Sequence, residues 1–288
     1  MSFQIVTDSS ANLPVELLRK HSIPFVPFHY YVGGKEVLCP ASDAFDGKAY
    51  FQLLREKETV TTSLVNPEQY IEVFEPFLKE GADILYVGMS SGISGSFQSS
   101  RIAAAELRER YPGRIIRVVD TLAASLGEGL LVLRAVELKE AGRSVMETAD
   151  IIEAERMQMM QIFTVGELMH LRRTGRVSGV SAAIGSALHI KPLLKGNTEG
   201  RIVVAGKAIG RKRSLKALAE YYGENQVRGE AQTIGIAHCD CEAEAEYLAA
   251  LIREICAPKE FMIVCYEPVT GSHVGPDTVA LFFMGKGR

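Results

Sequence analysis

The chain has 288 residues, 47% hydrophobic and 23% charged, a composition typical of a globular protein with a large core and enough length for two domains. Its 32 lysines and arginines against 35 aspartates and glutamates give a net charge of −3, which does not favour nucleic acid or an anionic membrane as a partner. No stretch reaches the roughly 18 uninterrupted apolar residues of a membrane span, and the start lacks the features of a secretion signal, so we expect a cytoplasmic protein without an integral membrane segment.

Alternating apolar strands and helical segments predict an α/β domain over residues 1–158, built on an open parallel sheet with right-handed crossovers. The segment 23–32 contains two prolines and is typical of an edge strand, and Gly33-Gly34 predicts a turn into a strand at 35–38. We expect the remaining strands at 3–6, 84–87 and 114–119, and helices beginning near Pro14 and at 49–56, 68–79, 101–110, 123–141 and 144–160.

Polar, hydroxyl-rich segments follow four of the predicted β segments, near Thr7, Thr62, Ser90 and Asp120. In an open parallel sheet, ligands bind outside the carboxyl ends of the strands. We therefore expect these four segments to meet at one edge of the sheet and to form a binding site there.

The loop of residues 90–100, SSGISGSFQSS, lies between an apolar strand and a helix. Gly92 and Gly95 allow backbone amides to turn toward one point, and the following helix adds its free amides and the positive end of its dipole. Ser94 and Ser96 add hydroxyl donors. The loop therefore predicts an anion site, although the same small residues also suit a tight turn that caps a helix.

The same loop permits an enzymatic alternative, because Gly88-Met89-Ser90-Ser91-Gly92 matches the G-x-S-x-G pattern of a nucleophile elbow. Ser90 as nucleophile, Asp120 as orienting acid and His273 as base would make a serine acyl hydrolase. An elbow needs its helix directly after the nucleophile, whereas residues 92–95 extend this loop. A sugar-kinase or dihydroxyacetone-kinase-like domain is a third hypothesis, but the chain has no P-loop.

Residues 159–288 are predicted to form an α+β domain with a mixed or antiparallel sheet. Between its last two strands, His273 is expected in a loop bounded by Gly271 and Gly275. We expect strands at 161–165, 190–194, 201–206, 233–238, 261–267 and 278–284, and helices at 166–172, 213–222 and 242–255.

The five cysteines are odd in number and irregularly spaced, which does not resemble the disulfide framework of a secreted protein. His238-Cys239-Asp240-Cys241 lacks a second pair of ligands at metal-binding spacing. We therefore expect neither a metal ion nor a cofactor.

Seven short motifs occur in the order found in the DegV family of bacterial fatty-acid-binding proteins, which the sequence resembles over nearly its whole length. Each motif is short, and the specificity lies in the ordered set. The motifs are Val6-Thr7-Asp8-Ser9-Ser10, Thr62-Ser63, Ser90-Ser91-Gly92-Ile93-Ser94-Gly95-Ser96-Phe97-Gln98, Val119-Asp120-Thr121, Gly175-Arg176-Val177-Ser178, Lys191-Pro192 and Gly271-Ser272-His273-Val274-Gly275-Pro276.

The resemblance implies a two-domain lipid carrier rather than an enzyme, with one acyl chain in an apolar tunnel and its carboxylate at the domain junction. It also implies a role as the carrier subunit of a bacterial fatty-acid kinase, which presents the carboxylate to a separate, ATP-dependent kinase subunit. Arg173 and Arg176, in a basic turn, are expected to contact that partner. By the resemblance, the fatty-acid-binding residues are Thr62, Ser63, Ser94, Gly95, Ser96 and His273.

The sequence departs from the family pattern at several positions. Leu64-Val65-Asn66-Pro67 replaces the usual Gln-Pro-Ser-Pro, Ser96 replaces a threonine, and Asp277 replaces a glycine. Lys207-Ala208-Ile209 stands where many members have Lys-x-Arg, which bears on kinase docking more than on lipid binding.

Overall fold

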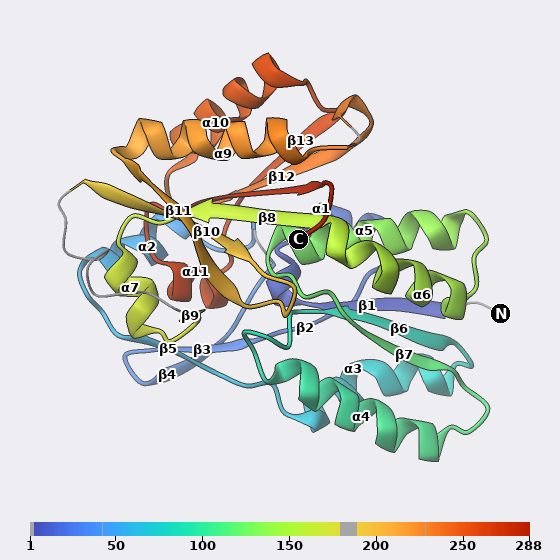
Figure 1. Ribbon diagram of the computed structural model, residues 1–288. Helices are drawn as coiled ribbons and strands as arrows, with labels where there is room; N and C mark the ends of the chain where they lie inside the picture. The colour runs from blue at the N-terminus through green and yellow to red at the C-terminus, as the bar shows by residue number, and fades with distance from the viewer. Residues whose placement is uncertain (1–2, 42, 179–188, 228) are drawn as a thin grey trace.

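The computed structural model describes residues 3–41, 43–178, 189–227 and 229–288, and this part of the chain contains three β-sheets (Figure 1). The first is a parallel sheet in the order β2-β1-β6-β7. Its strands are β1 (Phe3–Asp8), β2 (Phe25–Val26), β6 (Asp83–Gly88) and β7 (Ile116–Asp120). Helices α3 (Pro67–Lys79) and α4 (Ser96–Arg110) pack on one face, and α5 (Leu126–Glu140) and α6 (Val145–Glu155) pack on the other. Since every residue of β6 is buried, the sheet is covered on both faces as predicted.

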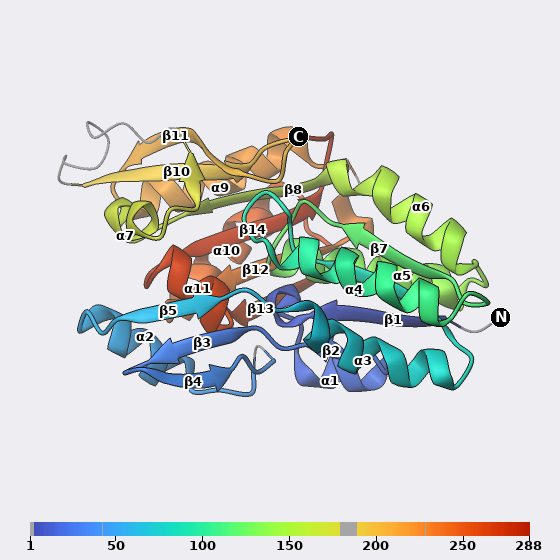
Figure 2. The ribbon, with the colours of Figure 1, turned by 90° about the horizontal axis from the view of Figure 1, so that it is seen from below.

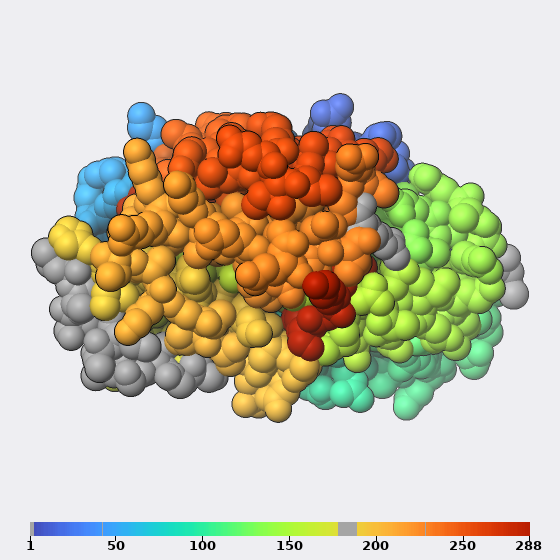
Figure 3. Space-filling model, turned by 45° about the horizontal axis from the view of Figure 1, so that its top comes forward, coloured from blue at the N-terminus to red at the C-terminus, as the bar shows by residue number. Residues whose placement is uncertain are grey.

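The second sheet is mixed and has the order β13-β12-β14-β8-β10-β11-β9. Helices α9 (Arg211–Asn225) and α10 (Glu242–Ile255) cover one face of it, and Figure 3 shows their side chains forming a continuous outer surface. The strands are β8 (Met159–Thr164), β9 (Val177–Ser178), β10 (Ile190–Gly196), β11 (Ile202–Ile209), β12 (Thr233–His238), β13 (Glu260–Cys265) and β14 (Val279–Met284).

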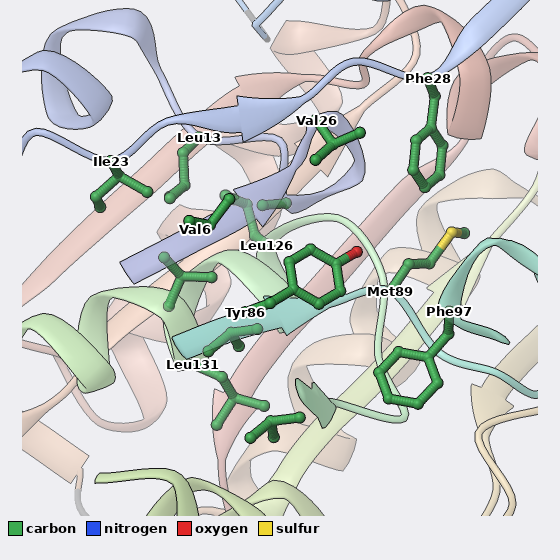
Figure 4. Close-up of a cluster of buried hydrophobic side chains, with 14 of the residues drawn as sticks. Val6, Leu13, Ile23, Val26, Phe28, Tyr86, Met89, Phe97, Leu126 and Leu131 are labelled. Carbon is green, nitrogen blue, oxygen red and sulfur yellow. The ribbon is translucent and has the colours of Figure 1, made fainter. Parts of the chain in front are cut away.

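Helix α5 lies between the two large sheets, since it contacts β1 and β6 on one side and β8, β12 and β14 on the other. Leu126 at its start packs in the same buried cluster as Val6, Tyr86 and Phe97, shown in Figure 4. Residues from both halves of the chain thus share one core. The domain boundary near residue 158 stays a prediction.

The third sheet is antiparallel, in the order β4-β3-β5, and is formed by β3 (His29–Val32), β4 (Lys35–Leu38) and β5 (Val60–Ser63). Figure 2 shows it beside α2 (Gly47–Arg55) and α11 (Pro268–Val274). The Gly33-Gly34 turn is confirmed, with φ of 56° and 75°. The prediction that Thr62 lies at the edge of the parallel sheet is wrong, because β5 pairs with β3 in the register Tyr30↔Thr62. The β-branched run at 60–62 specifies a strand but not which strand it joins.

Two further expectations are wrong. The helix predicted over 144–160 ends at Glu155, because Met159 and Met160 pair with β14 and are buried in the mixed sheet. The loop predicted around His273 is the helix α11, which begins after the buried Glu267. Both oxygens of that carboxylate cap the helix, accepting hydrogen bonds from the amides of residues 269 and 270 at 2.6 and 2.7 Å.

Gly271 is needed inside α11 for packing rather than for a turn. A β-carbon at this position would lie 2.7 Å from the ring of Phe51 in α2. The glycine therefore lets α11 approach α2 closely, and this approach fixes the helix that carries His273.

Candidate functional site

His273 and Thr62 come together at the contact between α11 and the three-stranded sheet. Nε2 of His273 lies 3.0 Å from Oγ1 of Thr62, and the imidazole is mostly buried. Ser63, the next residue of β5, is half-buried. Two residues that are 211 positions apart in the sequence thus form one polar pair.

The predicted anion loop lies against the chain that follows β5. The Ser94 hydroxyl donates to Oγ of Ser96 at 3.1 Å, and the Ser96 amide donates back to Oγ of Ser94 at 3.2 Å. Oγ of Ser96 also accepts the amide of Val65 at 3.3 Å. Gly95 packs beside Leu64, whose side chain would lie 3.3 Å from a β-carbon at position 95. The loop and the end of β5 therefore form one structure at the start of α4.

Burial lowers the pKa of His273 to about 4, and the neighbouring Arg176 and His170 act in the same direction. The imidazole is therefore neutral at physiological pH and carries a single N–H. If Nε2 donates this proton to Thr62, the Thr62 hydroxyl is free to donate to a ligand. Nδ1 of His273 is buried and has no partner among the described residues.

The two arginines predicted to face a partner lie in different surroundings. Arg173 is 63% exposed and forms only a long, 3.8 Å ion pair with the equally exposed Glu167. Arg176 is half-buried, donates to the backbone carbonyl of Thr174, and has a pKa lowered by burial. Its charge acts on His273, so Arg176 belongs to the surroundings of the polar pair and Arg173 to the surface.

The geometry does not support the hydrolase alternative. The buried Ser90 hydroxyl donates to the carbonyl of Gly200 at 2.9 Å and accepts the Gly92 amide at 3.1 Å. Asp120 accepts two backbone amides, while His273 pairs with Thr62. Within the described ranges, no hydrogen bond joins any two of Ser90, Asp120 and His273. Ser90 is thus a structural hydroxyl rather than an activated nucleophile.

Ser90 instead fixes a turn that sequence reasoning did not connect with this loop. Gly200 ends the turn between β10 and β11 with φ +69°, and a β-carbon there would lie 2.1 Å from Oγ of Ser90. A β-carbon on Gly92 would lie 2.4 Å from the carbonyl of Glu199. Gly92 and Gly200 therefore allow the two turns to approach each other closely. The sequence alone does not show that these two glycines lie together.

A small, largely apolar cavity of about 50 Å³ adjoins the site. Ile93, next to Ser94, and Val274, next to His273, line it together with Phe163 and Phe282 of the mixed sheet. Residues from both halves of the chain thus form its apolar walls.

A larger cleft of about 910 Å³ lies between α2, α7 (Leu168–Arg173) and α11. Its lining is charged, and its most basic group, Arg55, already pairs with Asp240 and Asp277 at 2.5 and 2.8 Å. This surface does not suit an acyl chain.

The first motif turns inward instead of joining the site. Asp8 is buried and accepts the Tyr86 hydroxyl at 2.5 Å and the Met89 amide at 3.1 Å. The buried Glu128 of α5 contacts Oγ of Ser10 at 2.5 Å and Oγ1 of Thr7 at 3.1 Å. These residues therefore attach β1 to α5.

The described residues contain neither a helix suited to crossing a membrane nor a cluster of metal ligands. None of their helices is long and apolar enough to cross a membrane. Across the same ranges, no group of three or more histidine, cysteine, aspartate or glutamate residues is arranged to hold a metal ion.

A family model described as "Uncharacterised protein, DegV family" matches residues 2–286. A DegV domain-containing protein of Clostridium perfringens is 41% identical over 98% of this chain and 97% of its own length. A fatty-acid-binding DegV family protein of Thermus thermophilus is 31% identical, with a TM-score of 0.86 over 98% of this chain and 99% of the other. DegV of Bacillus subtilis, also a fatty-acid-binding protein, is 26% identical, with a TM-score of 0.83 over 99% and 100%. Both solved structures are of fatty-acid-binding proteins, and this chain belongs to the DegV family.

Proposed function

We propose that this protein binds a long-chain fatty acid and presents its carboxylate to a separate, ATP-dependent kinase subunit. The carboxylate is held by hydroxyls and loop amides at the junction of the two halves, and the acyl chain extends into the apolar cavity. The observation that carries the proposal is the partly buried Thr62–His273 pair, since Val274, the residue after His273, lines that cavity. The solved relatives support it, because the Thermus protein and its Bacillus counterpart bind fatty acids.

The chemistry of the pair suits a carboxylate. A buried anion needs several hydrogen-bond donors, and hydroxyls and amides at the start of a helix supply them without a metal ion. Thr62 donates from one side. Ser94 donates from the other side, together with the amide of Gly95, once its hydroxyl rotates away from Oγ of Ser96. Arg176 supplies positive charge nearby, whereas Ser63 follows Thr62 in β5, so its side chain points to the opposite face of the strand.

The cavity must widen to take an acyl chain. An apolar cavity of about 150 Å³ holds benzene, so about 50 Å³ is far too small for a long-chain fatty acid. Side chains in its wall are therefore displaced when the chain enters. The gain comes from transferring the apolar chain out of water, at about 0.8 kcal/mol for each buried methylene.

Presentation to a kinase follows from what the site lacks among the described residues. Its hydroxyls and neutral imidazole hold a carboxylate without removing its charge, and Ser90 is occupied by Gly200. The carboxylate therefore remains a nucleophile for a phosphoryl group supplied by a partner. Residues 160–216 contain 11 lysines and arginines against two glutamates, a net charge of +9, which suits docking of an acidic surface.

Native mass spectrometry tests lipid binding directly. The protein purified from cells should carry a mass increment equal to one long-chain fatty acid, and organic extraction should remove it. Protein that carries no such increment, and gains none when incubated with long-chain fatty acids, would refute the proposal. The kinase step is tested separately by measuring acyl-phosphate formation with a candidate kinase subunit and ATP.

A further inference from the structure

A polar side chain, the amide of Gln161 in β8, forms part of the cavity wall. Its Nε2 donates to the carbonyl of Leu122 at 3.1 Å, and its Oε1 accepts the amide of Ala124 at 3.2 Å. The carbonyl of Leu122 also accepts a hydrogen bond from Arg288 at 2.6 Å. The amide is thus bonded at both ends in a mostly apolar wall.

Two glycines leave just enough room for this amide. A β-carbon on Gly127 of α5 would lie 3.1 Å from Oε1 of Gln161 and 3.0 Å from the ring of Phe282. A β-carbon on Gly196 of β10 would lie 2.7 Å from Nε2 of Gln161. The side chain is therefore enclosed by α5 on one side and by β10 on another.

Sheet register places Gln161 away from the carboxylate end. Strand β14 begins at Val279, five residues after Val274, and Phe282 pairs with Gln161. Three residues of strand span about 10 Å. The cavity lining therefore extends from Val274, next to His273, to Gln161 and Phe282 at the other end.

We infer that Gln161 is the floor of the acyl cavity and sets the longest chain that the protein accepts. This inference rests on the proposed function, since it assigns the far end of the same site. The apolar side chains Phe163 and Ile93 are held by packing alone and yield to the entering chain. Gln161 resists, because displacing it breaks two hydrogen bonds and leaves the partly buried amide of Ala124 without this acceptor.

This geometry predicts an optimum rather than a steady rise of affinity with chain length. Each methylene buried before the floor should strengthen binding about fourfold. The first methylene that must displace Gln161 should weaken binding about tenfold instead. The affinity should therefore fall abruptly for chains longer than the optimum and decrease gradually for shorter chains.

The test is a competition titration of delipidated protein with saturated fatty acids of increasing chain length. Gln161→Ala should move the optimum to longer chains and raise the affinity for acids just beyond the wild-type limit about tenfold. Gln161→Val should have the same effect, and valine is a good strand former. The valine variant is used instead if Gln161→Ala does not fold.

Gln232 is the matched control. It is 6% exposed, and its amide is bonded at both ends to the backbone of Met284, at 2.7 and 3.2 Å, outside the cavity. Gln232→Ala should leave the optimum unchanged. If the wild type shows an optimum chain length that both Gln161 variants retain, another residue forms the floor of the cavity. That result would refute this inference but not the proposed function. If the wild type binds no fatty acid, the proposed function fails with it.

Discussion

The hydroxyl of Thr62 offers the sharpest test of the head-group site, because valine replaces it with nearly the same shape. A hydrogen bond from a hydroxyl to a buried carboxylate contributes about 1.5–3 kcal/mol, and its loss leaves the desolvation cost of the anion uncompensated. Thr62→Val should therefore weaken fatty-acid binding about tenfold to a hundredfold. Ser94→Ala should have an effect of similar size, since both hydroxyls are proposed to contact the same anion.

The assay is a titration of delipidated protein with a fatty acid and with the fatty alcohol of equal length. The alcohol carries no anion, so its affinity should fall much less with either substitution. Thr61→Val is the matched control, because Thr61 precedes Thr62 in β5 but is exposed. Equal losses for acid and alcohol, or an equal loss in the Thr61 variant, would show that the head group binds elsewhere.

Three further predictions concern Arg173, Ser90 and Glu128. Arg173→Ala should slow phosphoryl transfer in a reconstituted kinase assay while the fatty-acid affinity stays the same; an unchanged rate would remove Arg173 from the docking surface. Ser90 should not react with a fluorophosphonate probe. Ser90→Ala should lower the free energy of unfolding by about 1–3 kcal/mol, because the buried carbonyl of Gly200 loses its hydrogen-bond donor. Ser91 is exposed, so the control variant Ser91→Ala should have little effect on stability. Burial raises the pKa of Glu128 well above its ordinary 4.5, and the nearby Asp8 acts in the same direction. The stability that the neutral carboxyl of Glu128 contributes is therefore present below pH 4.5 and is lost as the pH rises through the raised pKa. Urea unfolding across this range should show a steeper loss for the wild type than for Glu128→Gln, and identical pH profiles would mean that Glu128 does not titrate.

Local sequence signals were sufficient where an element is determined by its own residues. The strand 233–238 and the helix 242–255 occur as predicted, because a continuous apolar run and a 3.6-residue periodicity need no distant partner. The parallel strands near residues 3, 84 and 116 are confirmed for the same reason. The family resemblance assigned Thr62 and His273 to one site, and their side chains lie 3.0 Å apart, although their role in binding stays a prediction.

The errors concern residues whose structure depends on distant contacts. His273 lies in a helix because Glu267 caps it and Gly271 packs against Phe51, whereas two nearby glycines in the sequence suggest a loop. Ser90 matches a nucleophile pattern, yet a turn 110 residues later takes its hydroxyl. No window around residue 90 contains that information.

Helix α5 has a consequence for how a ligand leaves. Because both large sheets rest on this one helix, pulling the halves apart would expose apolar surface on two faces at once. A hinge between rigid halves is therefore a costly route, and we expect a single cooperative unfolding transition. If the protein binds a fatty acid as proposed, we expect the lipid to leave along its own axis, with its charged end emerging first between α11 and the loop at residue 94. The carboxylate of the fatty acid, which a partner would modify, is thus also the first part of the lipid to reach water.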